Sequence, residues 1–497
     1  MHSLVGDLVL VRFAAQQDAL LHRRLYNALR QAILDKSLAP LTRLPASRDL
    51  ATQLGISRNS VITVYEQLLA EGYVNTRQGS GTFVAQTLPD SLFVPQACGI
   101  AAGSVPAEPV FSRRGQQLLE NISASPSQWG AFIPGVPDVN AFPHQRFSKI
   151  QARISRRPSP GQLTYSSHGG APALQQALVE YLRVSRSVNC SAEQILIVEG
   201  VHQAIDLVTR LLTNPGDNAW IEEPSYWGSR HILQMNDVRL CPIDVDQAGM
   251  NPPDSAENIP RLIFVTPSHQ YPLGPVMSLE RRQRLLNLAA RHPCWIVEDD
   301  YDSEFRFSGQ PIPALQGLVP DAPVIYIGTF SKTLYPGLRI GYLVLPPMLA
   351  KPFRNAHAEL YRSGHSLIQT TLAEFIDSGL YTAHIRRMRL LYSKRRALLC
   401  QLITAAFGPQ ALNEFNDNAG LHLILHLPAG ADDVAIANHA NNQGILVRAL
   451  SRYYVGNNPR RGLLMGFASI SEDDMPDAFA RLVESVRLYC PQALWMA

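Results

Sequence analysis

Apolar positions in the first 85 residues recur with the period of short helices. One helix is predicted where four apolar residues share helical spacing, with arginines between them: Leu21, Leu25, Leu29 and Ile33. A second helix is predicted over residues 47–54, with Ser47 as its N-terminal cap, and a third over residues 58–71, with Ser57 as its cap. The segment therefore predicts a helix, a second helix, a tight turn and a third helix.

Two short strands are predicted next, residues 73–76 and 82–85, joined by the glycine-rich tip 77–81. Three helices followed by such a hairpin make the winged helix-turn-helix arrangement. In it the last helix enters the major groove of DNA by its N-terminal residues, and the hairpin lies along the adjacent backbone or minor groove. The candidate DNA contacts at these places are Ser57, Arg58, Asn59, Ser60 and Thr63 in the helix and Gly79 and Gly81 in the hairpin.

Three short motifs in this segment point to one class of DNA-binding domain. They are Leu-Pro-Ala-Ser-Arg at 44–48, Leu-Gly-Ile-Ser-Arg at 54–58 and Gln-Gly-Ser-Gly-Thr-Phe at 78–83. With these motifs, residues 18–85 resemble the GntR-type DNA-binding head. The resemblance implies double-stranded operator DNA as a partner, with phosphate or base contacts from Arg48 and Arg58. The alternative is that both arginines are only solvated surface residues.

Residues 86–110 are predicted to be a linker. They contain four prolines and two glycines, no Lys or Arg, and no helical or strand periodicity. A proline-rich segment of this kind is semi-extended, so the domains on either side need not touch. The expected domains are therefore a DNA-binding domain over residues 1–85 and a second domain over residues 111–497.

Apolar runs alternate with helical patterns along the second domain. The runs cover residues 194–198, 218–221, 261–265, 295–297 and 324–327. Such alternation predicts an α/β fold with a mostly parallel sheet covered by helices on both faces. Because ligand sites in these sheets lie at the carboxyl ends of the strands, the residues that follow each run are the candidates for chemistry.

Composition and charge narrow the class of protein. Of 497 residues, 46% are hydrophobic and 17% charged, as in globular proteins with large cores. No apolar run is long enough for a membrane helix and no signal peptide is evident, so a cytoplasmic protein without membrane contact is expected. The six cysteines are scattered, which predicts reduced thiols and no metal site. The net charge of +3 comes entirely from Met1 to Ala85, and this modest asymmetry suits a nucleic-acid-binding head.

The chemistry-bearing residues cluster after the last two runs. Asp299 and Tyr301 follow the run that ends at Val297, and Lys332 lies in the segment after Ile327. A lysine there can form a Schiff base with an aldehyde, and a carboxylate can keep a pyridine nitrogen protonated. A phosphate would be bound by the Thr329 and Ser331 hydroxyls, by the Arg339 guanidinium, and by the backbone of a helix start at Val201 and His202.

Serine-lysine followed by Pro-Gly-Leu-Arg at 336–339 is the most specific of these signals. With it, nearly all of residues 111–497 resemble fold-type-I pyridoxal-phosphate enzymes, with a smaller α+β part from about residue 385 onward. The resemblance implies pyridoxal 5'-phosphate as cofactor and gives roles to nine residues. Lys332 would form the internal aldimine, Asp299 would pair with the pyridine nitrogen, Tyr301 would bond the phenolic oxygen, Tyr226 would stack on the ring, and Thr329, Ser331, Arg339, Val201 and His202 would hold the phosphate. Tyr226 could instead be a core aromatic, and His202 is equally well a neighbour of the helix cap.

Two positions depart from the enzymes' pattern. Tyr271-Pro-Leu-Gly stands where Asn-Pro-x-Gly is usual, so the amide that would tune the phenolic oxygen is absent. Leu464-Met-Gly-Phe stands where Arg-x-Ser/Gly-Phe is usual, so the arginine that clamps a substrate carboxylate is missing. Arg448 is the favoured replacement, expected at the end of a small-domain strand after the apolar run 444–447, and Arg452 is the second choice.

A basic stretch between residues 384 and 396 lies on a predicted long helix. It could be a second DNA contact. The favoured interpretation is a helix that joins the large and small parts of the second domain and carries a solvated basic face.

The GntR head, the proline-rich linker, Pro-Ser-His-Gln at 267–270 and Glu-Asp-Asp-Tyr-Asp-Ser-Glu-Phe-Arg at 298–306 together resemble the MocR regulators. The resemblance implies a homodimeric, pyridoxal-phosphate-dependent transcriptional regulator that senses an amino effector or the cofactor itself through aldimine chemistry at Lys332. The rival interpretation is a working aminotransferase that carries a DNA-binding head. The two missing side chains favour sensing over turnover.

Overall fold

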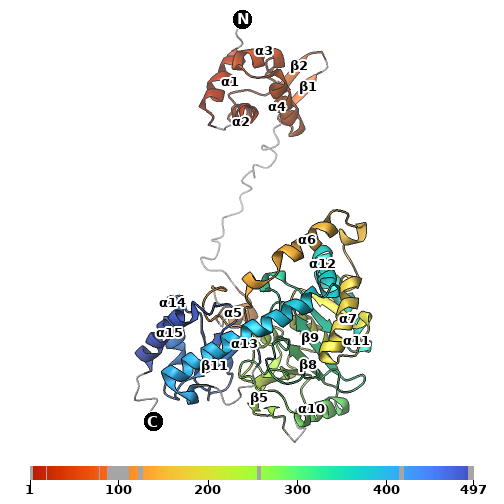
Figure 1. Ribbon diagram of the computed structural model, residues 1–497. Coiled ribbons are helices and arrows are strands. Elements are labelled where there is room, and N and C mark those ends of the chain that lie inside the picture. The colour runs from red at the N-terminus through yellow and green to blue at the C-terminus, as the bar shows by residue number, and fades with distance from the viewer. Residues whose placement is uncertain are drawn as a thin grey trace. The chain divides into compact units, whose positions relative to one another are not determined.

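The computed structural model describes residues 4–17, 20–77, 79–86, 111–120, 127–253, 259–412 and 419–490. The chain divides into two compact units, Met1–Val110 and Phe111–Ala497 (Figure 1). The predicted linker, apart from Gln86, lies outside the described residues, as does Gln78 in the hairpin tip.

The N-terminal unit is a small helical domain with a two-stranded hairpin. Its elements are α1 (Leu4–Ala15), α2 (Leu21–Leu34), α3 (Ser47–Leu54), α4 (Arg58–Ala70), β1 (Val74–Arg77) and β2 (Gly81–Val84). The periodic apolar residues form its core, where Leu25, Leu29, Val61 and Leu68 are fully buried. The winged helix-turn-helix prediction is therefore confirmed. Helix α1 was not predicted, because its sequence is apolar on almost every side and has no helical period to read.

The helix caps of this unit differ from one another. The Ser57 hydroxyl accepts a hydrogen bond from the Ser60 backbone N–H, so the predicted cap of α4 is present. The predicted cap of α3 is wrong. Ser47 is the first helical residue, and the capping position belongs to Ala46, whose side chain has no hydroxyl to accept a bond.

An eight-stranded sheet forms the centre of the larger unit. Its strands are β3 (Ile195–Val198), β4 (Asn218–Glu223), β5 (Arg239–Asp246), β6 (Gly249–Met250), β7 (Leu262–Val265), β8 (Trp295–Asp300), β9 (Val324–Thr329) and β10 (Gly341–Val344). The order is β3-β10-β9-β8-β7-β4-β5-β6, with β10 and β6 antiparallel to their neighbours and the strands from β9 to β5 parallel. The predicted mostly parallel sheet is confirmed.

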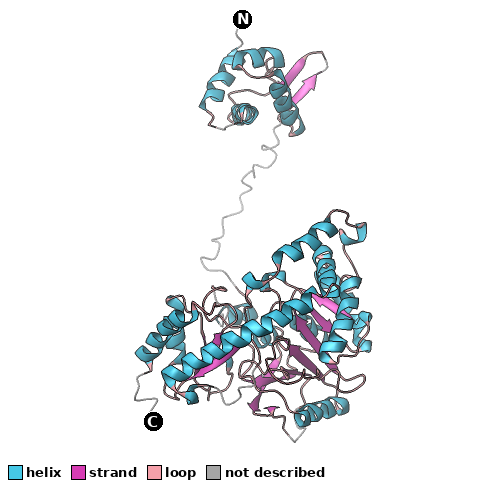
Figure 2. Cartoon of the chain, in the orientation of Figure 1, coloured by secondary structure: helices cyan, strands magenta, loops and turns pink. Residues whose placement is uncertain are grey.

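Helices cover both faces of this sheet (Figure 2). They are α7 (Pro172–Arg186), α8 (Val201–Leu212), α9 (Trp227–Met235), α10 (Leu279–Arg291), α11 (Pro347–Tyr361) and α12 (Ser366–Asp377). Helix α6 (His144–Ser155) lies against α12, and α5 (Arg113–Glu120) lies against α9. Side chains of one strand alternate between two cores, since Ile195 and Ile197 belong to one cluster and Leu196 and Val198 to another. No helix among the described residues is both long and apolar enough to cross a membrane.

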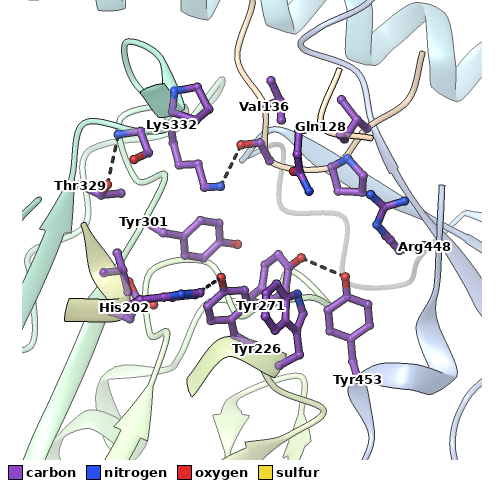
Figure 3. A pocket seen from close by; sticks show the side chains of 18 of the residues that line it. Gln128, Val136, His202, Tyr226, Tyr271, Tyr301, Thr329, Lys332, Arg448 and Tyr453 are labelled. Carbon is purple, nitrogen blue, oxygen red and sulfur yellow. Dashed lines mark hydrogen bonds between the residues drawn. The ribbon is translucent and has the colours of Figure 1, made fainter. Parts of the chain in front are cut away.

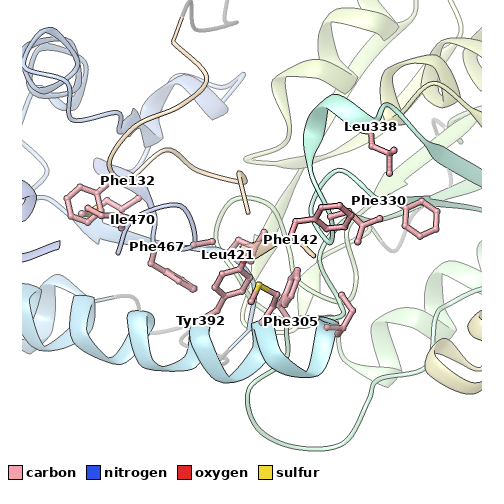
Figure 4. Close-up of a cluster of buried hydrophobic side chains, with 14 of the residues drawn as sticks. Phe132, Phe142, Phe305, Phe330, Leu338, Tyr392, Leu421, Phe467 and Ile470 are labelled. Atoms are coloured by element: carbon pink, nitrogen blue, oxygen red, sulfur yellow. The ribbon is translucent and has the colours of Figure 1, made fainter. Parts of the chain in front are cut away.

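The smaller part of this unit is a three-stranded antiparallel sheet with helices. It contains β11 (His422–His426), β12 (Arg448–Ala449), β13 (Gly462–Gly466), α14 (Asp433–Asn442) and α15 (Met475–Tyr489), with the order β11-β13-β12. Helix α13 (Leu380–Phe407) leads into it. Aromatic side chains of the two parts meet along this helix, where Tyr392 packs on Phe305 with ring centres 5.1 Å apart (Figure 4).

The basic stretch lies on α13, as predicted, but its face is only partly solvated. His384, Arg395 and Arg396 are buried, whereas Arg386, Arg387, Arg389 and Lys394 are exposed. Arg395 forms ion pairs with Asp138 at 3.0 Å and Glu472 at 3.1 Å. Arg395 thus fastens the helix to its neighbours, which a pattern of charges along the sequence does not reveal.

Candidate functional site

A cavity of about 330 Å³ lies where the carboxyl ends of the central strands meet the smaller part of the unit. Ten residues singled out from the sequence line it (Figure 3): Val201, His202, Tyr226, Asp299, Tyr301, Thr329, Ser331, Lys332, Arg339 and Arg448. The structure also brings in residues that the sequence did not flag, among them Gln128, Ile133, Gly135, Trp227 and Tyr453. Residues around 128–136 carried no signal because they are far from the strand ends in sequence.

Lys332 presents its amine to the cavity from the segment after β9. Its Nζ donates a hydrogen bond to the Gly135 carbonyl oxygen at 2.9 Å. Burial lowers the pKa of Lys332, while Asp302 and Asp299 act in the opposite direction. A lysine with a depressed pKa is a better nucleophile near neutral pH than an exposed one.

Asp299 is half-buried in the wall of the same cavity. It was predicted to follow a strand that ends at Val297, but β8 continues to Asp300, so Asp299 lies within the strand. Burial raises its pKa to about 7, the nearby Asp300 adds to the rise, and Lys332 opposes it. Its Oδ1 atom is buried and has no hydrogen-bond partner among the described residues. A buried carboxylate oxygen of this kind needs a donor, and a protonated ring nitrogen is one.

The predicted phosphate-binding groups lie close together at one end of the cavity. Arg339 donates from Nη2 to the Glu199 carbonyl oxygen at 2.6 Å, and the Thr329 hydroxyl accepts from the Ser331 N–H at 3.1 Å. Gly200 precedes α8 with φ +95°, and a Cβ atom there would lie 3.2 Å from the Arg339 guanidinium. Glycine therefore lets the start of α8 approach this arginine, which leaves a helix N-terminus and a cation side by side.

His202 and Tyr226 form a pair on the floor of the cavity. The Nε2 atom of His202 lies 2.8 Å from the Tyr226 hydroxyl. Burial lowers the pKa of His202, and the positive charges of Arg339 and Lys332 lower it further. His202 makes no side-chain cap of α8. Tyr226 is more than a core aromatic, because its side chain lines the cavity (Figure 3).

Tyr301 lines the cavity and belongs to a buried polar group. Its hydroxyl lies 2.8 Å from Nδ1 of His269, and the same nitrogen lies 3.1 Å from each carboxylate oxygen of Asp302. The Pro-Ser-His-Gln motif that contains His269 was noted in the sequence, but nothing in its pattern pointed to Tyr301.

Arg448 enters the cavity from the side opposite Lys332 (Figure 3). It is the first residue of the two-residue strand β12, so the prediction that it ends a strand is wrong, although it does line the cavity. Its Nη1 donates to the Val447 carbonyl oxygen at 3.1 Å, and within the described part of the chain no carboxylate forms an ion pair with it. Burial lowers its pKa. Arg452 is exposed and does not line the cavity.

Tyrosine side chains line the cavity between His202 and Arg448 (Figure 3). The hydroxyls of Tyr271 and Tyr453 are 3.2 Å apart, and the Tyr271 ring packs edge-to-face against Tyr226 with centres 5.7 Å apart. Tyr271, the residue that departs from the Asn-Pro-x-Gly pattern, thus has its hydroxyl against that of Tyr453.

The predicted DNA contacts form an exposed set in the N-terminal unit. Arg48, Ser57, Arg58, Asn59, Thr63, Gly79 and Gly81 are exposed, and Ser60 is half-buried. Neither Arg48 nor Arg58 forms an ion pair with another described residue. Gly79 and Gly81 have φ +78° and +111°, which glycine adopts without strain. Two further exposed arginines were not predicted as DNA contacts: Arg77 ends β1 within the hairpin, and Arg43 lies beside Gly81.

Comparisons with known proteins agree with this architecture. The family described as aminotransferase class I and II matches residues 139–482, and bacterial regulatory proteins of the gntR family match residues 21–84. The probable rhizopine catabolism regulatory protein MocR of Rhizobium meliloti is 40% identical over 94% of this chain and 93% of its own length. The HTH-type pyridoxine biosynthesis transcriptional regulator PdxR of Corynebacterium glutamicum is 30% identical over 94% and 96%.

The larger unit also resembles solved enzymes. The kynurenine aminotransferase of Pyrococcus horikoshii is 25% identical, with a TM-score of 0.66, over 76% of this chain and 95% of that one. The regulators thus match nearly the whole chain, whereas the enzyme matches the part that contains the cavity.

Proposed function

Because the chain belongs to the MocR-type regulators, which join a GntR head to an aminotransferase domain, we propose that it regulates transcription by binding DNA. In this proposal the larger unit holds pyridoxal 5'-phosphate and senses an amino compound, or the cofactor itself. The observation that carries it is one cavity lined by the Lys332 amine, the unpartnered carboxylate oxygen of Asp299 and the Arg339 guanidinium.

The residues of the cavity fit the cofactor. When bound, pyridoxal phosphate supplies an aldehyde carbon that an amine can attack and a ring that withdraws electrons once its nitrogen is protonated. Lys332 would hold it covalently, and Asp299 would keep a proton on the ring nitrogen. Arg339, Thr329, Ser331 and the start of α8 would bind its phosphate. Tyr226 would pack on the ring, and Tyr301 would donate to its phenolic oxygen.

An anionic amino compound suits the far side of the cavity. Arg448 is half-buried, its guanidinium has no acidic partner among the described residues, and Tyr271 and Tyr453 lie beside it. A ligand carboxylate would relieve the cost of leaving that cation buried without a counter-charge. An amino acid whose amine meets Lys332 and whose carboxylate meets Arg448 is therefore the proposed effector class.

The head would supply DNA recognition. The exposed start of α4, with Arg58 and Asn59, would enter the major groove, and the hairpin with Gly79 and Gly81 would lie along the backbone. A homodimer would place two heads on an operator, and an effector that binds one closure state of the larger unit better than another would change how the heads sit on DNA.

The second candidate function is a working aminotransferase with a DNA-binding head. The presence of both Lys332 and Asp299 supports it, since these groups suffice to hold the cofactor and activate it. The replacement of the carboxylate-binding arginine by the buried Leu464 favours sensing.

One set of measurements on the full chain separates these functions. Borohydride reduction followed by peptide mapping should place the cofactor on Lys332, and a panel of amino acids should then be titrated against the cofactor absorbance and against operator affinity. A regulator changes operator affinity when the absorbance changes, without accumulation of keto acid. Steady keto acid production with unaltered operator affinity favours the enzyme, and absence of cofactor from Lys332 would falsify both.

A further inference from the structure

We propose that His269 is a positioning residue that turns the Tyr301 hydroxyl toward the cavity, with Asp302 holding the His269 ring in place. The inference rests on the proposed function, because the Tyr301 hydroxyl would act on bound pyridoxal phosphate. It concerns a residue that would not touch the cofactor but would act through Tyr301.

Three side chains form the group, and all are buried. The Tyr301 hydroxyl lies 2.8 Å from Nδ1 of His269, and both oxygens of the Asp302 carboxylate lie 3.1 Å from that nitrogen. Tyr301 is 9% exposed, His269 is 6% exposed and Asp302 is 1% exposed, so water does not compete for these contacts.

The position of the proton follows from what each group can do. An ionised carboxylate only accepts hydrogen bonds, so Nδ1 of His269 must carry the hydrogen if its contact with Asp302 is to be attractive. That hydrogen is then shared between the carboxylate and the Tyr301 oxygen. Tyr301 thereby accepts from His269 and keeps its own hydroxyl hydrogen, which can be donated into the cavity that it lines.

Close packing leaves the His269 ring little room to adopt another orientation. Gly420 has φ +78°, and a Cβ atom there would overlap with Cε1 of His269 and lie 2.8 Å from Oδ2 of Asp302. The ring of His422, on β11, lies 5.3 Å from the His269 ring, and His422 itself contacts the Pro272 carbonyl oxygen through Nε2 at 3.1 Å. Among the described residues, the hydrogen-bond partners of His269 Nδ1 are the Tyr301 hydroxyl and the Asp302 carboxylate.

The departure at Tyr271 gives this group its importance. An asparagine there would add a second donor to the phenolic oxygen of the cofactor, but the Tyr271 hydroxyl lies against Tyr453 instead. The hydrogen bond from Tyr301 then has more influence on the bound cofactor, and the direction of its hydroxyl matters more. His269 and Asp302 fix that direction.

The test uses full-length protein loaded with pyridoxal phosphate and measures the pH at which the absorbance of the lysine-bound cofactor changes. A donor to the phenolic oxygen stabilises its anionic form, so Tyr301→Phe should move the midpoint upward by about one to two pH units. His269→Phe should move it in the same direction, and the double variant should shift no further than Tyr301→Phe alone.

Two conservative variants make the test specific. The amide nitrogen of His269→Asn stands near the place of Nδ1 and should restore the wild-type midpoint. The amide of His269→Gln stands near the place of Nε2 and should behave like His269→Phe. Equal midpoints for the Asn and Gln variants, or additive shifts in the double variant, overturn the positioning role.

The Asn and Gln pair decides the question even if His269→Phe does not fold. Borohydride labelling of the wild type is the separate control. A wild-type protein without cofactor on Lys332 defeats the proposed function itself, whereas a labelled wild type with unmoved midpoints defeats only the role of His269.

Discussion

Arg448 of β12 lies directly opposite Leu464 of β13 in the small antiparallel sheet. Side chains of directly opposed residues share one face of a sheet. By its motif resemblance Leu464 would stand where the related enzymes carry their carboxylate-binding arginine, and it is fully buried among apolar neighbours. The guanidinium is thus supplied by the neighbouring strand on the same face, which explains how the cavity has a cation although the usual arginine is missing.

Arg448→Ala should weaken the binding of an anionic amino effector by about 2 to 3 kcal/mol, the worth of a charge-assisted bidentate pair. The cofactor should stay on Lys332. The measurement is a titration of cofactor absorbance with the best amino acid from a panel. Arg452→Ala is the matched control, because Arg452 is exposed and outside the cavity. If Arg448→Ala titrates like the wild type, the effector has no carboxylate at this place.

Lys332→Ala should abolish covalent attachment of pyridoxal phosphate and leave the fold intact, since the Lys332 side chain lines the cavity and its amine has one backbone hydrogen-bond acceptor, the Gly135 carbonyl oxygen. Mass spectrometry after borohydride treatment checks the attachment, and circular dichroism checks the fold. Lys394→Ala, an exposed lysine on α13, should keep the label. A label that persists in Lys332→Ala would assign the attachment to another lysine.

Asp299 should make the cofactor-free protein less stable as the pH rises. Burial raises its pKa from 3.8 to about 7, so between these values the folded state holds a proton that the unfolded state has released. The free energy of unfolding therefore falls as the pH rises from about 4 to 7 and levels off above. Asp299→Asn removes the cost of ionising a buried carboxyl. The free energy of unfolding of this variant should therefore exceed that of the wild type by up to about 4 kcal/mol at pH 8 and by almost nothing at pH 4.

Urea denaturation of the larger unit at several pH values checks this prediction. Asp473→Asn changes an exposed carboxylate, and its free energy of unfolding should depend on pH in the same way as that of the wild type. If the free energies of unfolding of Asp299→Asn and the wild type differ by the same amount from pH 4 to pH 8, Asp299 is ionised in the folded protein at all of these pH values. Pyridoxal phosphate should abolish the difference, because a protonated ring nitrogen would satisfy the charged form.

Arg58→Ala should weaken specific DNA binding by about 1 to 3 kcal/mol without altering the cofactor spectrum, since Arg58 opens the helix that would enter the major groove. Operator affinity at fixed salt is the measurement. Arg183→Ala, an exposed arginine of the larger unit, is the control. Unchanged affinity in Arg58→Ala would move the contact elsewhere, with Arg48→Ala as the next variant.

Ser57→Ala should lower the free energy of unfolding of the N-terminal unit by about 1 kcal/mol, because it removes the acceptor for the Ser60 N–H. Ser47→Ala is the matched comparison, since Ser47 does not occupy the capping position of α3. It should have a much smaller effect. Thermal unfolding of the two variants gives the answer, and equal losses would contradict the difference in capping.

The sequence by itself carried the features that depend on neighbours along the chain. The period of Leu21, Leu25, Leu29 and Ile33 predicted α2, and the run before Lys332 predicted β9, because the apolar spacing of a helix or a strand is a local property. The site residues at the strand ends could be predicted for the same reason. Parallel strands bring their carboxyl ends to one edge, so residues that follow separate strands meet in one cavity.

Only the tertiary structure decided which distant residues touch. His269 and Tyr301 are joined through a contact that no spacing encodes, and Arg448 is placed beside Leu464 by strand pairing within the small sheet. The C-terminal end of β8 was misjudged because Glu298 and Asp300 are acidic yet buried. They are stabilised by partners from elsewhere in the fold such as Arg186, which pairs with Asp300 at 2.7 Å. In a sequence, charged residues that follow an apolar run are taken to end the predicted strand. Whether such residues are buried depends on a partner that only the folded structure supplies.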